Sequence, residues 1–379
     1  MNQAMITGTG LYVPSNKVSN EALVASFNKQ VNDFNQINAE LIEQNKLESY
    51  PESSSEFIKK ASGIESRYFV ESTGILNPNR MRPLIAKRAD NDISLQCEMS
   101  LQAAHQALNE AQIKGSDIDL VIVSCSNIQR PYPAIAIELQ HALGAKGFAF
   151  DMNVACSSAT FAIDIARNTI RTNSATRALI VNPEVCSGHL DFTDRDSHFI
   201  FGDACTAMVV ESYECGSQSG FLIESTLLKT DYSNNIRNNN GFLNYAETVD
   251  NDLKSLNVEY FKQNGRKVFK EVVPMAVEHI LTHLKENQLN PESIKRFWLH
   301  QANINMNQLI AKKILGERIS EDRIPCILNR FANTGSPGSI IAHHLYKKDF
   351  QKNEHGLICS FGAGYSIGSI LVKKICISI

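Results

Sequence analysis

Several features that would assign the chain to a whole class of protein are absent from its 379 residues. Its apolar runs, such as 120–123 and 178–181, fall far short of the roughly twenty residues that span a bilayer. Basic residues are not in excess, since 37 Lys and Arg face 40 Asp and Glu, so we do not expect a nucleic-acid partner. The first residues lack a charged segment followed by an apolar one, and we expect neither a signal peptide nor a membrane span.

Cysteine occurs nine times, but never in the C-x-x-C spacing of zinc and redox motifs. The number is odd and the positions are scattered: Cys97, Cys125, Cys156, Cys186, Cys205, Cys215, Cys326, Cys359 and Cys376. This distribution favours reduced thiols in a cytoplasmic protein over a disulfide framework, and it predicts no metal site.

The composition is that of a globular protein, with 43% apolar and 20% charged residues. Strand-like and helix-like segments alternate along the chain, which indicates a layered α/β fold. The expected strands cover residues 4–12, 120–125, 147–155, 177–182, 206–211, 220–226, 296–300, 356–361 and 366–373. The expected helices cover residues 93–111, 134–143, 157–171, 268–287, 305–315 and 339–346.

Three polar segments interrupt this alternation, and their roles are unassigned. Residues 29–54 are rich in Asn, Gln, Glu and Ser and are expected to form a surface excursion with room for a helix. Residues 71–91 are expected to form a basic loop, and residues 234–252 an Asn-rich loop or lid. Around these segments the chain divides into two parts of similar rhythm, which is compatible with usual domain sizes.

Cys156 is the first candidate for chemistry. It stands in FDMNVACSSATFA, where an expected strand runs into an expected helix that begins with small residues. A helix N-terminus favours a thiolate, which predicts a lowered pKa and a reactive nucleophile. The same backbone N–H groups can stabilise an oxyanion on an attacked carbonyl. For any single cysteine, the alternative is a small buried residue at the end of a strand.

Three further segments carry weaker signals. His300 follows a buried strand in WLHQAN, and functional groups collect where the strands of open α/β sheets end. Asn333 lies in the turn ANTGSPG. The segment FGAGYSIG at 361–368 joins the last two strands through small residues, which let a backbone N–H approach a ligand. A structural histidine, an ordinary turn and a glycine hairpin are the respective alternatives.

In this order, the segments together resemble the ketoacyl-ACP synthase III family of the thiolase superfamily. The similarity covers ACSSATFA around Cys156, FGDACTA at 201–207, HQAN, ANTGSPG and FGAGYSIG, and GIESRYF at 63–69 extends it forward. It implies the thiolase fold, with two similar βαβαβαββ halves in five layers, α-β-α-β-α. The first half, 1–214, would carry the nucleophile, and the second, 215–379, would carry His300 and Asn333.

The resemblance implies a decarboxylative Claisen condensation in fatty acid biosynthesis. Cys156 would take the acyl group of an acyl-CoA. Malonyl-ACP would then lose CO₂, and the resulting carbanion would attack the acyl-enzyme to give 3-oxoacyl-ACP. Neutral hydrogen-bond donors on His300 and Asn333 would stabilise the negative charge that develops on the malonyl thioester oxygen. The backbone N–H groups of Cys156 and Ala363 would form the oxyanion hole for acylation. No metal or cofactor is implied.

The resemblance also implies residues that bind CoA and the carrier protein. Phe57, where better-known members have Trp, and Arg195 would stack on the CoA adenine. Gly265 and Arg266 belong to a segment similar to the mouth of the CoA channel. A basic rim for the acidic carrier protein, with a plain solvated helix surface as the alternative, would comprise Lys267, Lys270, Lys312 and Lys313.

Tyr132, in QRPYPAIAIE, lies in a segment that resembles the part of the acyl pocket that crosses the dimer interface. With strand 177–182 near the two-fold axis, this predicts a homodimer. The sequence of the segment resembles that of the branch that uses medium-chain acyl-CoA. Each buried methylene group of a longer acyl chain would favour its binding by up to about 0.8 kcal/mol.

Two departures from the family pattern affect binding. Ala61 and Asn305 stand where better-known members have arginines that bind CoA and the carrier protein.

Two other functions stay open. A head-to-head acyl-CoA condensing enzyme or a secondary-metabolite synthase of the same fold would differ in segment 127–138, or in a carboxylate delivered by the partner subunit. A non-catalytic synthase-like subunit would only bind and support a partner. The retention of Cys156, His300 and Asn333 argues against this last function.

Overall fold

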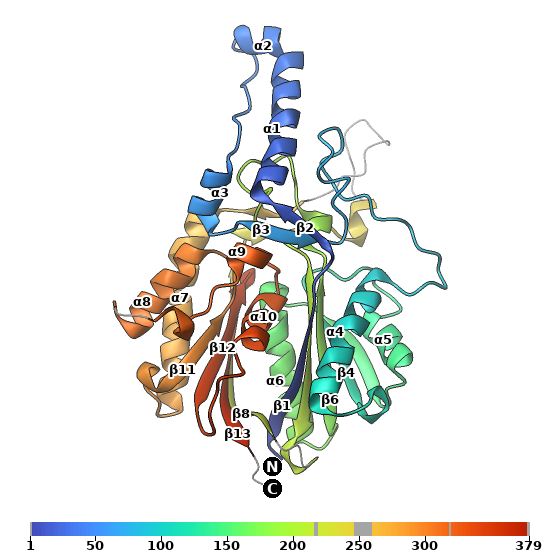
Figure 1. Cartoon of the computed structure of the whole chain (residues 1–379), viewed down its shortest axis with the longest axis vertical. Coiled ribbons are helices and arrows are strands. Elements are labelled where there is room, and N and C mark those ends of the chain that lie inside the picture. Colours follow the sequence, from blue (N-terminus) through green and yellow to red (C-terminus); the bar gives the residue numbers. More distant parts are fainter. Residues whose placement is uncertain (1, 216–218, 246–259, 318–319, 377–379) are drawn as a thin grey trace.

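The computed structural model describes residues 2–215, 219–245, 260–317 and 320–376. Its centre is a nine-stranded sheet in the order β11-β12-β13-β8-β1-β7-β6-β4-β5 (Figure 1). All nine strands were predicted from the sequence, and only their ends differ. They are β1 (Ala4–Tyr12), β4 (Leu120–Ser124), β5 (Phe148–Met152), β6 (Arg177–Glu184), β7 (Ala204–Ser212), β8 (Ser219–Ser233), β11 (Ile294–Leu299), β12 (His355–Gly362) and β13 (Gly364–Cys376).

Six helices, each of them predicted, form three layers around this sheet. One outer layer packs on β4 and β6, a middle layer lies between the two parts of the sheet, and the other outer layer packs on β11 and β12 (Figure 1). The outer helices are α4 (Leu95–Ala111) and α5 (Ile135–Leu143) on one side, and α7 (Gly265–Glu286) and α8 (Ile304–Leu315) on the other. The middle helices are α6 (Ser158–Arg171) and α10 (Pro337–Leu345). The predicted five layers are therefore confirmed.

The apolar patterns explain why these segments take these places. Every residue of β4 is buried, because helices cover both of its faces, and this accounts for its continuous apolar run. In α6 the buried Ala159, Ala162, Ile163 and Ala166 recur every three or four residues. Burying a side chain as large as Ile163 stabilises the fold by about 2 kcal/mol. Because the middle helices pack on both parts of the sheet, they contribute to the core of both.

The two halves are similar but not identical. The first follows the order β1-α4-β4-α5-β5-α6-β6-β7, which is the expected βαβαβαββ. Among the described residues, the second half has one strand fewer between α8 and α10, and Asn333 instead forms an isolated bridge with Phe201 of the first half. The halves also share one sheet, since β1 pairs with β7 along its length and with β8 at Met5 and Ile6.

The free edge of the first half belongs to β5, which ends the sheet order. Strand 177–182, which was expected near a two-fold interface, forms most of β6 and lies inside the sheet between β7 and β4. A strand paired on both sides has no unpaired backbone groups to offer a partner, and the expected place of this strand near a two-fold interface stays a prediction.

The segment 29–54 forms an arm that projects from the body (Figure 1). It contains the end of α1 (Asn20–Ile37) and all of α2 (Ala39–Glu43), so the predicted helix is confirmed. Phe34 and Tyr50 stack at 4.3 Å between ring centroids and hold the returning chain against α1. The returning chain leads into α3 (Ser55–Ser62), and short strands β2 (Asn16–Ser19) and β3 (Ser66–Phe69) pair beneath the arm.

The other two interruptions differ. Residues 71–91 contain no helix or strand, as predicted for a loop. In the segment 234–252 the described residues form β9 (Ile236–Arg237), which pairs with β10 (Lys262–Gln263), and a helical turn at Phe242–Tyr245. Residues 246–252 lie outside the described residues.

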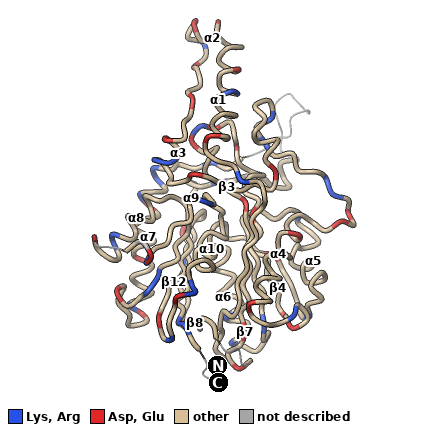
Figure 2. The backbone as a smooth tube through the Cα atoms, viewed as in Figure 1, with Lys and Arg blue, Asp and Glu red and all other residues tan. Residues whose placement is uncertain are grey.

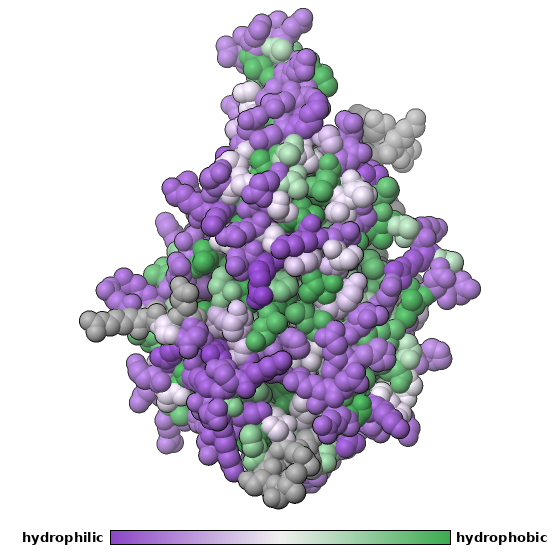
Figure 3. Space-filling model, in the orientation of Figure 1, coloured by the Kyte–Doolittle hydropathy of each residue, from purple (hydrophilic) through white to green (hydrophobic). Residues whose placement is uncertain are grey.

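The surface shows mixed polarity. Lys and Arg alternate with Asp and Glu along most of the chain (Figure 2). On the face seen in Figure 3, polar residues separate the apolar areas, one of which lies at the tip of the projecting arm, where Ile37 and Leu41 are exposed. No helix in the described ranges is long and apolar enough to cross a bilayer.

Candidate active site

Cys156 lies in a sharp turn after β5. The strand ends at Met152, a 3₁₀ turn covers Ala155–Ser157, and α6 begins at Ser158. The expected strand and helix were therefore too long at this junction, and Cys156 precedes the α-helix by two residues. Ala155 takes a left-handed conformation with φ of 46°, and its N–H donates to Asn153 Oδ1 at 2.8 Å. The turn holds the cysteine at the end of the strand and half-buried.

The connection between β12 and β13 closes over this turn. A Cβ atom at Gly362 would lie 2.6 Å from Cys156 Cβ and 3.0 Å from its sulfur, so no larger residue has space there. Ser157 Oγ donates to the carbonyl oxygen of Ser366 at 3.0 Å, and Ser366 Oγ donates to the carbonyl oxygen of Ala363 at 2.9 Å. These bonds tie the nucleophile turn to the FGAGYSIG segment.

The pKa of the Cys156 thiol is raised to about 12, mainly by burial and further by the Glu184 carboxyl. The backbone N–H groups of Ala363 and of Cys156 itself face the sulfur and act in the opposite direction. The predicted lowering of the pKa is therefore wrong for this state, because a helix N-terminus two residues away does not offset the loss of solvation. The thiol is protonated at neutral pH, and its proton must leave during the attack on a substrate.

His300 follows β11 and is 2% exposed. Its N–H donates to the carbonyl oxygen of Cys359 at 2.8 Å, and its carbonyl oxygen accepts from Asn307 Nδ2 at 3.0 Å. The ring lies edge-on to Phe361, with centroids 5.3 Å apart. Burial lowers the pKa of His300 to about 4, so the imidazole is neutral at physiological pH and offers an N–H donor.

Asn333 is anchored on three sides in the turn before α10. Its N–H donates to the carbonyl oxygen of Ile200 at 3.0 Å, and its own carbonyl oxygen accepts from the N–H of Gly202 at 3.0 Å. Its side-chain oxygen accepts from the N–H of Gly335 at 2.9 Å. This last bond fixes the amide orientation and leaves the Nδ2 hydrogens as the donor side.

The end of β12 brings two of the candidates together. Phe361 contacts the His300 ring, and the next residue, Gly362, contacts Cys156. His300 and Cys156 therefore lie beside neighbouring residues at the end of β12. The structure thus joins Cys156 of the first half to His300 of the second.

Glu184, at the end of β6, is a residue of this site that the sequence analysis missed. Its Oε1 accepts from the N–H of Ser126 at 2.8 Å, from Ser126 Oγ at 2.9 Å and from Ser336 Oγ at 2.7 Å. Among the described residues, Oε2 is buried and has no partner. Burial raises the pKa of this carboxyl. The available signal was an acidic residue three positions after the apolar run 178–181, in RALIVNPE.

The predicted CoA-binding pair is also brought together. Arg195 lies over the ring of Phe57, with 4.3 Å between the guanidinium carbon and the ring centroid, and its Nε donates to the carbonyl oxygen of Glu52 at 2.8 Å. The two groups stack on each other, so an adenine can lie between them only after they separate. Gly265 and Arg266 lie in the exposed first turn of α7.

The four lysines proposed for carrier-protein contact are exposed on two helices that pack together. Lys267 and Lys270 lie in the first turns of α7, whereas Lys312 and Lys313 lie near the end of α8. Lys312 is paired with Glu317 at 2.8 Å. The two positions that depart from the family pattern, Ala61 and Asn305, lie close together. Asn305 Nδ2 donates to the carbonyl oxygen of Ala61 at 3.4 Å, and the neighbouring Asn303 Nδ2 donates to the same oxygen at 2.7 Å.

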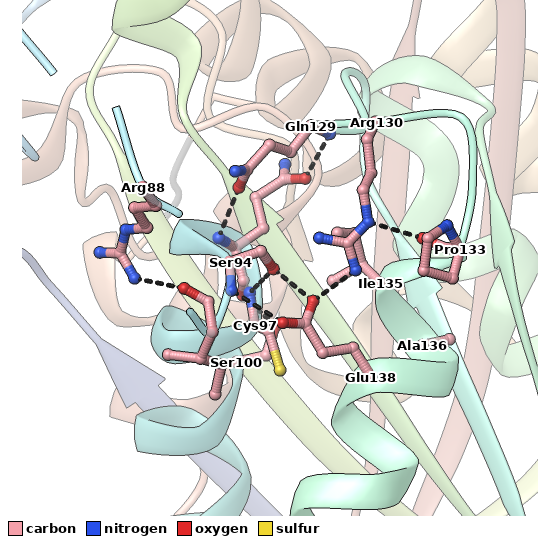
Figure 4. Close-up of polar contacts among 12 residues, drawn as sticks. Arg88, Ser94, Cys97, Ser100, Gln129, Arg130, Pro133, Ile135, Ala136 and Glu138 are labelled. Atoms are coloured by element: carbon pink, nitrogen blue, oxygen red, sulfur yellow. Dashed lines mark hydrogen bonds and ion pairs between the residues drawn. The ribbon is translucent and has the colours of Figure 1, made fainter. Parts of the chain in front are cut away.

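Tyr132 lies at the tip of loop 127–134 and is 82% exposed. A polar network holds the base of this loop to α4 and α5 (Figure 4). Arg130 donates to the carbonyl oxygen of Pro133 at 2.8 Å and to Glu138 at 2.7 Å (Figure 4). Ser94 Oγ, at the N-cap of α4, donates to the same Glu138 oxygen at 2.6 Å. The loop is therefore fixed by the protomer itself while its tyrosine points outward.

A cavity of about 1150 Å³ adjoins this loop. Its walls come from residues 85–96, 127–133, 137–142 and the segment after Glu184, and they include Ile128, Tyr132 and Pro133. Tyr132, which was expected to belong to the acyl pocket, therefore lines a cavity. Within the described residues, no group of three or more His, Cys, Asp or Glu side chains could hold a metal ion.

The fold and these groups define a class of protein, the acyltransferases of the thiolase fold. Comparison with known proteins supports this. The sequence model of the 3-oxoacyl-[acyl-carrier-protein (ACP)] synthase III family matches residues 150–231, and the model of its C-terminal part matches residues 284–374. The crystal structure of 3-oxoacyl-[acyl-carrier-protein] synthase III from Aquifex aeolicus superposes with a TM-score of 0.75 at 25% identity, covering 98% of this chain and 99% of that one.

The chain belongs to the 3-oxoacyl-ACP synthase III family. It is 52% identical to the beta-ketodecanoyl-[acyl-carrier-protein] synthase of Pseudomonas aeruginosa over 92% of this chain and 99% of that protein. It is 28% identical to the beta-ketoacyl-[acyl-carrier-protein] synthase III of Clostridium perfringens over 98% of this chain and 100% of that protein. The predicted family and enzyme class are thereby confirmed.

Proposed function

We propose that the chain condenses a medium-chain acyl-CoA with malonyl-ACP through an acyl-Cys156 intermediate. The observation that carries this proposal is the surroundings of the sulfur, which faces two backbone N–H groups, those of Ala363 and Cys156. The neutral ring of His300 packs edge-on against Phe361, which is two residues before Ala363 in the sequence. A nucleophile beside paired N–H donors is suited to acyl transfer.

In the first half-reaction the Cys156 sulfur attacks the thioester carbonyl carbon. The backbone N–H groups of Ala363 and Cys156 stabilise the oxyanion. The new S–C bond forms, the bond from the carbonyl carbon to the CoA sulfur breaks, and the thiol proton leaves with the CoA sulfur. Because the free thiol is protonated, this proton transfer accompanies the attack and does not precede it.

In the second half-reaction malonyl-ACP loses CO₂, and the electron pair of the broken C–C bond moves toward the thioester oxygen. His300 and Asn333 Nδ2 donate to that oxygen. Both donors are neutral, so they stabilise the developing charge without holding the malonyl carboxylate in place. The carbanion then attacks the acyl-Cys156 carbonyl and releases 3-oxoacyl-ACP. These steps use no metal or cofactor.

A medium acyl chain of eight carbons is the proposed primer. The Pseudomonas relative is named for a ketodecanoyl product, and malonyl adds two carbons to the primer. The cavity of about 1150 Å³ beside Tyr132 is large enough for such a chain, although its walls do not include Cys156. Phe57, Arg195, Gly265 and Arg266 are proposed to bind CoA, and the carrier-protein rim is proposed to comprise Lys267, Lys270, Lys312 and Lys313.

We also propose a homodimer formed through the β5 edge, with 1–214 and 215–379 as the two structural halves of each protomer. The support is the unpaired edge of β5 and the exposed Tyr132, Ile137 and Phe148 beside it. An isologous contact would place one β5 against its copy. Light scattering at micromolar concentration is expected to give the dimer mass, and a monomer would refute this part of the proposal. A cytoplasmic location remains a prediction.

One observation bears on head-to-head condensation. Segment 126–137 contains no Asp or Glu, and Glu138 is engaged by Ser94 and Arg130. The loop proposed to reach the partner therefore delivers no free carboxylate, which favours malonyl-ACP as the second substrate.

The test is mass spectrometry of the intact protein with octanoyl-CoA, followed by malonyl-ACP. We expect an octanoyl adduct on Cys156 that disappears as 3-oxodecanoyl-ACP forms. Cys156→Ser is the control and should gain no mass. Consumption of a second octanoyl-CoA in place of malonyl-ACP would favour the head-to-head enzyme. A higher kcat/KM for acetyl-CoA than for octanoyl-CoA would remove the medium-chain part alone.

A further inference from the structure

We propose that Glu184 is a positioning residue that holds the nucleophile Cys156 and the donor Asn333 in register with each other. The inference rests on the proposed condensation, which needs both groups at one substrate. Glu184 lies at the end of β6 and is fully buried. Two chains of hydrogen bonds lead from its Oε1 atom, one to each of the two groups.

The first chain leads to the nucleophile. Oε1 accepts from the N–H and the Oγ of Ser126. The carbonyl oxygen of Ser126 accepts from Asn153 Nδ2 at 2.7 Å, and Asn153 Oδ1 accepts from the N–H of Ala155 at 2.8 Å. Ala155 is the left-handed residue directly before Cys156, so this chain fixes the turn that aims the sulfur.

The second chain leads to the donor. Ser336 Oγ donates to Oε1 at 2.7 Å, and its N–H does so at 3.3 Å. Gly335, one residue earlier, has φ of 67°, and a Cβ there would lie 3.0 Å from Glu184 Oε1. The N–H of Gly335 fixes the side-chain oxygen of Asn333. The Asn333 turn is thus packed directly on the carboxyl.

These contacts satisfy Oε1 of the buried carboxyl, whereas Oε2 has no partner among the described residues. Burying a carboxyl is unfavourable unless hydrogen bonds satisfy it. Here the donors come from both halves of the chain, Ser126 from the first and Ser336 from the second. A smaller side chain would leave both serines without their acceptor. The turns that carry Cys156 and Asn333 would then no longer be held to the same carboxyl.

The test compares Glu184→Ala with Glu184→Gln in both half-reactions. We expect Glu184→Ala to lower both the rate of Cys156 acylation by octanoyl-CoA and the rate of CO₂ release from malonyl-ACP by at least about tenfold, because misplaced groups react slowly. The KM for octanoyl-CoA should stay within about twofold, since this residue does not touch CoA. Glu184→Gln keeps an oxygen acceptor and should retain both rates within about threefold.

Variants along each chain separate positioning from plain stability. Ser336→Ala should lower CO₂ release more than acylation, and Asn153→Ala should do the reverse. Two matched controls are Ser339→Ala, which removes a buried hydroxyl bonded to Ser360, and Glu110→Gln, which changes a carboxyl bonded to Thr9 and Lys347. Both controls should lower the melting temperature without changing either rate.

Three results would overturn the inference. The first is a Glu184→Ala protein with unchanged rates per folded molecule, and the second is a Glu184→Gln protein as slow as Glu184→Ala. The third is an equal effect of Ser336→Ala and Asn153→Ala on both half-reactions. If wild-type protein took no acyl group from octanoyl-CoA, the proposed function would fail instead. In that case the positioning role would be tested by the rate at which iodoacetamide alkylates Cys156. Glu184→Ala must change this rate at least about threefold.

Discussion

Gly362 lies so close to Cys156 that a single methyl group at this glycine would stand 2.6 Å from the Cβ of the cysteine and 3.0 Å from its sulfur. The two residues are far apart in the sequence and belong to different halves. Their contact sets the distance between the sulfur and the N–H of Ala363, the next residue. The position of the Ala363 N–H relative to the Cys156 sulfur therefore depends on the absence of a side chain at Gly362.

Replacing Gly362 with Ala should slow acylation of Cys156 by about 100-fold, because displacement by about 1 Å is enough to disrupt an attack geometry. The rate of octanoyl transfer from octanoyl-CoA, measured by intact-protein mass spectrometry, checks this. Gly241→Ala is the matched control, since the nearest atom to a Cβ at that position is the carbonyl oxygen of Asn239 at 3.9 Å. An acylation rate unchanged in Gly362→Ala would show that the contact is not needed.

His300→Ala should lower condensation by about two orders of magnitude or more, the scale of a lost oxyanion donor. Acylation of Cys156 should fall much less, because the donors for that step are backbone groups. Stopped assays of acyl-enzyme formation and of 3-oxoacyl-ACP formation separate the two effects. Asn333→Ala should show the same division, and an equal loss in both half-reactions would contradict it.

Alkylation of Cys156 by iodoacetamide should keep rising with pH and show no plateau up to pH 9. The thiol has a pKa raised to about 12, so the reactive thiolate fraction grows about tenfold for each pH step of one over this range. Peptide mass spectrometry distinguishes Cys156 from the partly exposed Cys215 and Cys326. A plateau below pH 8 would indicate a thiolate that exists before substrate binds.

The free energy of unfolding should fall as the pH drops from 6.5 toward 4. Burial lowers the pKa of six histidines to about 4: His189, His198, His279, His283, His300 and His344. Below their unfolded pKa of about 6.5 the unfolded chain binds more protons than the folded one, which favours unfolding. Three carboxyls with raised pKa values oppose this: Asp203, at about 6, and also Asp151 and Glu184. Urea midpoints at pH 7.5 and pH 5 provide the measurement, and a higher midpoint at pH 5 would contradict the expectation.

Phe57→Ala should raise the KM for acyl-CoA several-fold with little change in kcat. The ring lies under the Arg195 guanidinium, and a cation–π contact between half-buried groups contributes about 0.5–2 kcal/mol. Octanoyl-pantetheine, which lacks the adenine, is the matched substrate and should react equally with both proteins. An equal loss with both substrates would place Phe57 outside adenine binding.

The elements that pack on both faces could be predicted from the sequence because burial alone determines their composition. β4 is an example, since its apolar run follows directly from the helices that cover it. The functional candidates Cys156, His300 and Asn333 were found because each stands in a distinctive local motif. The projecting end of α1 was less well defined, since its polar residues form a helix that few neighbours cover.

The properties of the site depended on residues that the local sequence does not bring together. The pKa of Cys156 is set by burial against segments from the other end of the chain and by Glu184, so the local strand-to-helix pattern gave the wrong direction. Glu184 itself is linked to Ser336 across the two halves. A single acidic residue after a strand reveals no such partner until the strands are placed.

The pairing of β1 on both sides has a consequence for how the chain reaches its native state. Met5 pairs with Glu211 and with Leu222, so β1 has no partner strand until β7 and β8 have been synthesised. Contacts over such sequence separations slow folding and leave an apolar strand exposed in the meantime. During synthesis, residues 4–12 therefore stay unpaired until β7 and β8 have been made.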